Sequence, residues 1–143
     1  EIIGDIELFA REVKTPVITI TGSNGKTTVT MLMSMMAEKA GKRVLSGGNV
    51  GAPVLELLER EAPDLYVLEL SSFQLETTDS LNAISAVILN ISEDHMDRYT
   101  GMDDYAAAKG HIYDQCETAV VNREDAKVIE LAGTQSNITF GLD

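Results

Sequence analysis

The chain has 143 residues, of which 44% are hydrophobic, and this is enough for one globular domain with a buried core. Its net charge is −12, so we expect no nucleic-acid surface. Cys116 is the only cysteine, which excludes an internal disulfide and favours a reducing compartment. The sequence has no apolar run long enough to span a membrane and no secretory signal, and we therefore expect a cytoplasmic protein.

The first third of the chain predicts a helix, a strand and a second helix. Residues 2–12 have helical spacing that ends before Pro16, and residues 17–20 form a β-branched run typical of a buried strand. Residues 26–40 predict a longer helix that ends at Gly41. Apolar side chains at helical spacing predict that its core face includes Val29, Leu32, Met33, Met36, Ala37 and Ala40, and we expect the methionines from Met31 to Met36 to belong to the core.

The rest of the chain repeats this alternation. Further strands are expected at 43–46, 65–70, 84–91, 118–121 and 138–140. Further helices are expected at 54–61, 105–115 and 125–132, with a polar loop or short helix at 73–78. Such alternation predicts an α/β fold, a mostly parallel sheet of the P-loop NTPase type with helices on both faces, in a single domain. Ligands of these sheets bind beyond the carboxyl ends of the strands, where the chemical motifs should therefore lie.

The first motif, TGSNGKTT, runs from Thr21 to Thr28 between a predicted strand and a predicted helix. Its glycines allow a tight turn whose backbone N–H groups can surround phosphate, Lys26 can reach the β- and γ-phosphates, and Thr27 can bind Mg²⁺. The usual pattern has glycine where this chain has Ile20, so the motif is a variant. The expected nucleotide-binding residues are Gly22, Ser23, Asn24, Gly25, Lys26, Thr27 and Thr28.

Two further segments follow predicted strands. Glu69 ends an apolar run at the point where a Walker-B-type carboxylate would hold Mg²⁺. Ser71 and Gln74 come next, and on their own they are more typical of a helix cap than of a ligand site. The loop at 47–51, GGNVG, has glycines that allow a ligand to approach the backbone closely.

The segment NISEDHMDR places His95 among acidic residues just after another strand. Carboxylates beside an imidazole can raise its pKa, orient its ring or share a metal with it, while an ordinary salt-bridged loop histidine remains the alternative. Lys109 lies on the following helix in YAAAK, and its spacing alone favours a solvated helix face.

Taken in order, TGSNGKT, GGNVG, LELSSFQLE, NISEDHMDRY and YAAAK resemble the Mur ligases of peptidoglycan synthesis, and the ELSSFQLE and EDHMDRY forms resemble the D-glutamate-adding type. The resemblance implies ATP-dependent amide ligation that adds D-glutamate to UDP-N-acetylmuramoyl-L-alanine through an acyl phosphate. It implies that residues 1–143 belong to the central ATP-binding domain, without the N-terminal UDP-binding and C-terminal amino-acid-binding domains. The fragment alone should not ligate, and a monomer is expected.

The resemblance also implies roles for individual residues. Lys26 would bind the ATP phosphates, with Thr27 and Glu69 at a first Mg²⁺. His95 and a carbamylated Lys109 would hold a second Mg²⁺, and Lys26, His95 and Lys109 would be the catalytic set. Contacts to the UDP-muramoyl substrate would come from Asn49, Ser71, Gln74 and His95, while Asp94 and Asp97 would orient His95.

Three other functions compete with this one. A P-loop kinase or simple ATPase needs a catalytic base or an arginine finger, and the chain offers no clear candidate. A regulatory nucleotide-binding module would bind ATP tightly and leave Lys109 without a role. A folylpolyglutamate-type ligase shares the P-loop and the chemistry, but the SSFQLE segment weighs against it.

Overall fold

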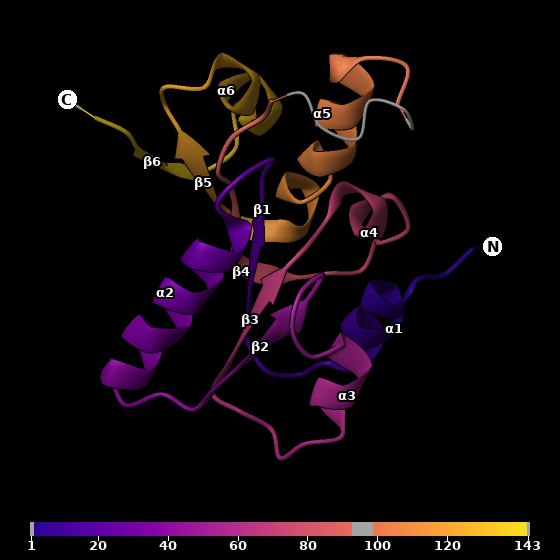
Figure 1. Ribbon diagram of the computed structural model, residues 1–143, viewed down its shortest axis with the longest axis vertical. Coiled ribbons are helices and arrows are strands. Elements are labelled where there is room, and N and C mark those ends of the chain that lie inside the picture. The colour runs from indigo at the N-terminus through magenta and orange to yellow at the C-terminus, as the bar shows by residue number, and fades with distance from the viewer. Residues whose placement is uncertain (1, 93–98, 143) are drawn as a thin grey trace.

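The computed structural model describes residues 2–92 and 99–142. Within them, one sheet contains six strands, all parallel, in the order β2-β3-β1-β4-β5-β6 (Figure 1). The strands are β1 Val17–Thr21, β2 Val44–Gly48, β3 Leu65–Glu69, β4 Ala83–Ile88, β5 Cys116–Asn122 and β6 Asn137–Phe140. The predicted α/β class with a mostly parallel sheet is confirmed.

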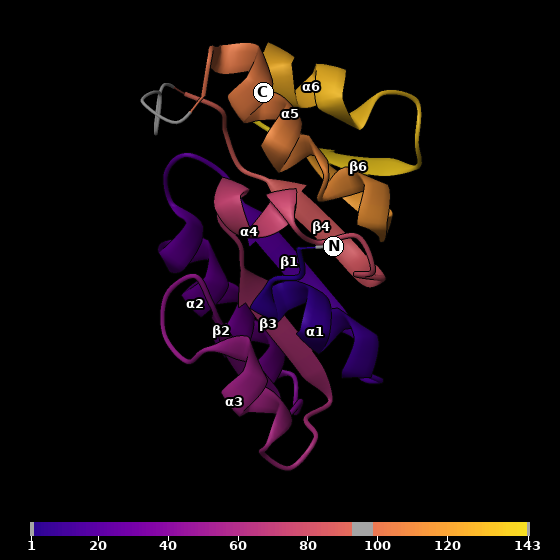
Figure 2. The same cartoon turned by 90° about the vertical axis from the view of Figure 1, so that its right-hand side faces the viewer.

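Helices cover the two faces of the sheet unequally. They are α1 Asp5–Glu12, α2 Lys26–Lys39, α3 Val54–Leu58, α4 Ser72–Glu76, α5 Met102–Gly110 and α6 Ala126–Ala132, with a 3₁₀ turn η1 at Tyr113–Gln115. Figure 1 shows α2 alone on one side of the strands, and Figure 2 shows α1, α3 and α4 together on the other. Helices therefore lie on both faces of the sheet around the carboxyl end of β1, where the chain leads into α2.

The central strands β1, β3 and β4 are largely buried because their side chains alternate between two apolar clusters, whereas β6 at the edge is exposed. In β3, Tyr66 and Leu68 pack toward α1 and α3, whereas Leu65 and Val67 pack toward α2. The same alternation in β4 places Ala86 and Ile88 in the first cluster and Val87 in the second. This explains why the strands appear in the sequence as continuous apolar runs.

The expected core face of α2 was wrong in part. Val29, Met33 and Ala37 do pack against the second cluster. Met31, Leu32, Met35 and Met36 are instead 52% to 66% exposed. The cause is that α2 rests on the sheet through one narrow stripe, and no other described helix lies on this face to bury its flanks. Gly41 ends α2 as predicted, with φ +86°.

Several element boundaries differ from the sequence-based expectation. Strand β2 continues through Gly47 and Gly48, which were expected in a loop. The helix expected at 105–115 divides into α5 and η1, and α3 ends at Leu58 rather than continuing to residue 61. The segment expected as a polar loop or short helix at 73–78 overlaps the helix α4, which begins one residue earlier, at Ser72.

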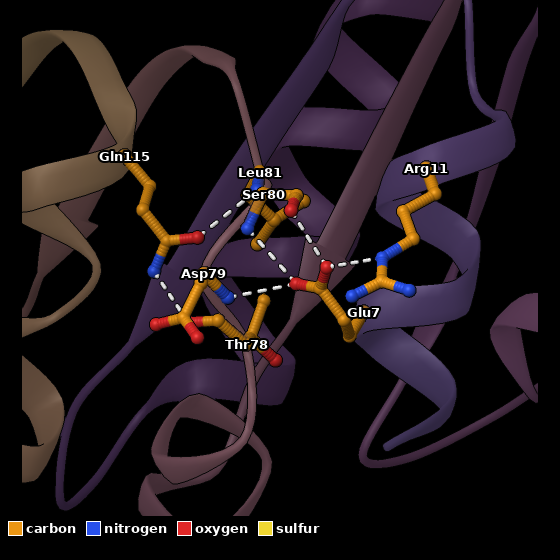
Figure 3. Close-up of polar contacts among 7 residues, drawn as sticks. All are labelled: Glu7, Arg11, Thr78, Asp79, Ser80, Leu81 and Gln115. Carbon is orange, nitrogen blue, oxygen red and sulfur yellow. Dashed lines mark hydrogen bonds and ion pairs between the residues drawn. The ribbon is translucent and has the colours of Figure 1, made fainter. Parts of the chain in front are cut away.

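A buried carboxylate joins α1 to the loop between α4 and β4 (Figure 3). Glu7 is 3% exposed and accepts hydrogen bonds from the backbone N–H groups of Asp79 (2.8 Å) and Ser80 (2.9 Å). It also accepts from the Ser80 hydroxyl at 2.6 Å and pairs with Arg11 at 2.7 Å. The Ser80 hydroxyl, the Asp79 N–H and Arg11 together lower the pKa of Glu7 to about 2. Gln115 holds the same loop from η1 by bonds to Leu81 N and the Thr78 carbonyl.

Candidate functional site

The loop between β1 and α2 has the backbone of a phosphate-binding turn. Gly22 and Gly25 have φ values of +151° and +87°, a region that L side chains avoid. At Gly22, a Cβ would also lie 3.0 Å from Leu89 Cβ and 3.3 Å from Leu89 N. Gly25 is the N-cap of α2, so the loop ends at a helix N-terminus, where backbone N–H groups and the helix dipole favour an anion.

Ile20, which departs from the usual P-loop pattern, points away from this turn. It is the fourth residue of β1, is 1% exposed and packs in the apolar cluster beneath α2. Its side chain therefore belongs to the core, and the variant position leaves the conformation of the loop intact.

Two lysines converge on one carbonyl of this loop. Lys26 Nζ donates to the Gly22 carbonyl oxygen at 2.8 Å, and Lys109 Nζ donates to the same oxygen at 3.1 Å. Lys109 Nζ also lies 3.3 Å from Thr21 Oγ1 and 5.0 Å from the centre of the Tyr105 ring. Lys109 is only 2% exposed, so the solvated helix face favoured by its spacing was wrong. Helix α5 instead directs its ammonium group at the candidate phosphate site.

The Thr27 hydroxyl contacts the carboxylate at the end of β3. Thr27 Oγ1 lies 3.0 Å from each oxygen of Glu69, which is 3% exposed. A cavity of about 230 Å³ opens beside them, lined by Thr27, Thr30, Met31, Ser46, Gly47, Val50, Gly51 and Glu69. The pair provides a hydroxyl and a carboxylate oxygen in one place, and Mg²⁺ prefers a few such ligands together with substrate phosphates.

The glycine-rich end of β2 brings Asn49 to the same edge of the sheet. The Asn49 N–H donates to the Glu69 carbonyl at 2.8 Å, and the Asn49 residue is exposed. This approach requires glycine at position 48, where φ is +115° and a Cβ would lie 2.3 Å from the Glu69 carbonyl oxygen.

Ser71 and Gln74 form the cap of α4. The Gln74 N–H donates to Ser71 Oγ at 3.2 Å, and the Ser71 N–H donates to Gln74 Oε1 at 3.0 Å, which is a reciprocal capping box. The capping that these residues predicted on their own is confirmed. Their expected contact with substrate stays a prediction.

The remaining expected residues divide into two groups. Ser23, Asn24 and Thr28 lie in the loop and the first turn of α2 as expected. His95, Asp94 and Asp97 lie outside the described residues, so their roles remain predictions. Within residues 2–92 and 99–142, no group of three or more His, Cys, Asp and Glu side chains is placed to hold a metal, and no helix is long and apolar enough to cross a membrane.

The sequence-based prediction missed two residues that contact the loop between β1 and α2. Asn90 hydrogen-bonds the backbone of Ser23 and Asn24, and Tyr105 Oη lies 3.1 Å from Ser23 Oγ. The available signal was position, since Asn90 follows β4, which pairs with β1 and must end beside the loop.

The chain is similar to proteins of one known family. A family model described as the Mur ligase middle domain matches residues 20–143. A UDP-N-acetylmuramoylalanine–D-glutamate ligase from Pasteurella multocida is 59% identical over 143 residues, all of this chain and 32% of that protein. The chain thus spans about a third of the length of the curated relatives it matches.

Two solved structures show the same fold. The MurF ligase of Thermotoga maritima, in complex with ADP, has a TM-score of 0.78 and 19% identity over 98% of this chain and 37% of that one. The FolC of E. coli, in complex with DHPP and ADP, has a TM-score of 0.70 and 15% identity over 96% of this chain and 46% of that one. The match to the family model over residues 20–143 and the identity across the whole chain establish that the chain belongs to the Mur ligase family and matches its middle domain.

Proposed function

We propose that this chain is the nucleotide-binding middle domain of an ATP-dependent ligase that joins D-glutamate to UDP-N-acetylmuramoyl-L-alanine. The observation that carries the proposal is the meeting of Lys26, Lys109 and the Thr27–Glu69 pair at one loop. The substrates are inferred from the 59% identity to a D-glutamate ligase along the whole chain. We infer a monomeric, cytoplasmic enzyme without a nucleic-acid partner, in keeping with the net charge of −12.

ATP would bind with its phosphates at the turn between β1 and α2. The backbone N–H groups of residues 22–28 and the Lys26 ammonium group would hold the phosphate oxygens. Thr27 and Glu69 fit a Mg²⁺ ion, because a hydroxyl and a buried carboxylate lie together beside the loop. When bound, Mg²⁺ would neutralise charge on the β- and γ-phosphates.

The reaction would proceed in two displacements. The carboxylate of the UDP-linked substrate attacks the γ-phosphorus of ATP. The bond between the γ-phosphorus and the bridging oxygen breaks, so ADP is released and the substrate becomes an acyl phosphate. The amine of D-glutamate then attacks the acyl carbon, inorganic phosphate leaves, and the amine loses a proton. Both steps place negative charge near the loop, where the Lys26 ammonium group can stabilise it.

Lys109 would have a separate role at a second Mg²⁺ ion, together with His95. As a carbamate, Lys109 would offer an anionic oxygen in place of its ammonium group. Its position supports this, since Nζ is buried and lies within 3.3 Å of Thr21 Oγ1 at the loop. Asn49, Ser71 and Gln74 would meet the UDP-linked substrate from the ends of β2 and β3.

The strongest alternative is a folylpolyglutamate-type ligase. The fold does not separate the two, because the FolC structure aligns with 96% of this chain. Sequence identity favours the D-glutamate ligase, at 59% against 15%. In a nucleotide-binding module that catalyses no reaction, the buried Lys109 at the loop would have no role.

A segment exchange tests the proposal. The matching segment of the full-length Pasteurella multocida ligase is replaced by this chain, and amide formation is measured with ATP, UDP-N-acetylmuramoyl-L-alanine and D-glutamate. We expect ligation that is lost with Lys26→Ala and kept with Lys39→Ala, an exposed lysine of the same helix. A folded exchange protein that binds the UDP-linked substrate but forms no amide would contradict the proposal.

A further inference from the structure

Asn90 attaches the phosphate loop to the sheet. It lies two residues beyond β4, the strand that pairs with β1 in the register Thr21 to Ile88. Its side-chain oxygen accepts from two consecutive backbone N–H groups, those of Ser23 at 3.0 Å and Asn24 at 2.9 Å. Its side-chain nitrogen donates to the Asn24 carbonyl at 3.0 Å. The carboxamide thus extends the pairing of β1 and β4 past the end of the ladder.

The chemistry of these contacts requires a carboxamide. One group must accept two N–H donors and also donate to a carbonyl, and a carboxylate cannot donate while a hydroxyl is too short to span all three. The Ser23 N–H is shared, because it also donates to the backbone carbonyl of Asn90 at 3.0 Å. Asn90 therefore fixes the stretch of loop that lies between Gly22 and Gly25, whose positive φ values make the turn.

Ser23 is held from a second direction. Its hydroxyl accepts from the Ser92 N–H at 2.9 Å and lies 3.1 Å from both the Ser92 carbonyl and Tyr105 Oη. Ser23 is 8% exposed, whereas Asn24 is exposed and its side-chain nitrogen donates to Ser92 Oγ at 3.3 Å. Asn90 holds both the N–H and the carbonyl of Asn24.

We propose that Asn90 is a positioning residue for the nucleotide phosphates, which fixes Ser23 and Asn24 so that the loop is formed before ATP arrives. This rests on the proposed function, in that the loop is taken to bind ATP. Preorganisation lowers the ordering cost of binding, so its loss should weaken the phosphate contacts and leave contacts to the nucleoside unchanged.

The test uses the full-length ligase that contains this chain and compares its affinity for Mg·ADP with its affinity for AMP by calorimetry. Asn90→Ala should weaken Mg·ADP binding about tenfold, the effect of losing hydrogen bonds worth roughly 1.4 kcal/mol. It should change AMP binding less than twofold. Asn90→Asp keeps the acceptor but adds a negative charge beside the phosphates, and it should weaken Mg·ADP further. Asn82→Ala, at the exposed opposite end of β4, should change neither.

Each contrary result has a distinct meaning. If Asn90→Ala is folded by circular dichroism and binds Mg·ADP as tightly as the wild type, the inference is overturned. Tighter binding would also overturn it, because the carboxamide would then compete with phosphate for the loop. An equal loss of ADP and AMP affinity would also overturn it, because the effect would then not lie at the β-phosphate, which ADP has and AMP lacks. Wild-type protein that binds neither nucleotide would overturn the proposed function and this inference with it.

Discussion

Thr27 and Glu69 are 42 residues apart in the sequence, yet the hydroxyl of one lies 3.0 Å from both carboxylate oxygens of the other. The contact exists because β3 pairs with β1 in parallel, with Ile20 opposite Glu69, so that both strands end at the same edge of the sheet. A buried carboxylate is thereby placed beside the first turn of α2, where a nucleotide phosphate would lie.

Replacement of Glu69 by glutamine should weaken Mg²⁺ binding and shift the Mg²⁺ dependence of ligation to higher concentration. The amide keeps the size of the side chain and can still contact Thr27, but it loses the negative charge that attracts the ion. In the exchange protein described above, we expect ligation to fall on the order of 100-fold, and the remaining rate to need a higher Mg²⁺ concentration. Glu59→Gln, at an exposed position after α3, is the control. A Glu69→Gln enzyme with the wild-type Mg²⁺ dependence would refute the assignment.

Two glycines, one at the end of β2 and one in the loop after it, allow the effect of backbone strain to be distinguished from that of a steric clash. Gly48 and Gly51 both have positive φ, at +115° and +85°. A Cβ at Gly48 would lie 2.3 Å from the Glu69 carbonyl oxygen, whereas a Cβ at Gly51 would have nothing within 4 Å. Gly51→Ala should therefore cost about 1 kcal/mol of unfolding free energy, from conformation alone. Gly48→Ala should cost clearly more, and equal losses in urea unfolding would show that the two backbones do not approach this closely.

The buried Glu7 makes stability depend on acid pH. Its pKa is lowered to about 2 in the folded chain from an ordinary value of 4.5, so its contribution is complete above about pH 4.5 and is lost as the pH falls toward 2. Glu7→Gln should cost about 1 to 3 kcal/mol at pH 7. Urea unfolding should show this difference from wild type shrinking between pH 4.5 and 2.5. Glu12→Gln, exposed at the end of the same helix, should cost little at either pH. A loss of stability in Glu7→Gln that does not change with pH would show that the hydrogen bonds of Glu7 do not depend on its ionised carboxylate.

The sequence predicted well those features that depend on strand ends. Lys26, Thr27 and Asn49 lie just after strands and Glu69 is the last residue of β3, and parallel pairing brings strand ends together whatever the details of packing. Burial was less predictable. The spacing of Leu32 and Met36 is that of a core face, but whether a flank of α2 is covered depends on which helices lie on that side of the sheet.

The side-chain contacts to the loop between β1 and α2 could not be predicted from the sequence. Asn90 could be placed at the correct edge, but the direction of its carboxamide toward Asn24 depends on the turn made by two positive-φ glycines. The burial of Lys109 likewise depends on how α5 packs over the loop, which its helical spacing does not specify.

The most direct test of the proposed phosphate site is calorimetric titration with Mg·ATP of the exchange protein, the Pasteurella multocida ligase in which this chain replaces the matching segment. We predict that Lys26→Ala weakens binding about 10- to 100-fold, as expected for the loss of a charge-assisted contact of roughly 1.5 to 3 kcal/mol, while Lys39→Ala binds as the wild type does. Equal affinity of the Lys26→Ala variant and the wild type would contradict the account, because the nucleotide phosphates would then lie elsewhere.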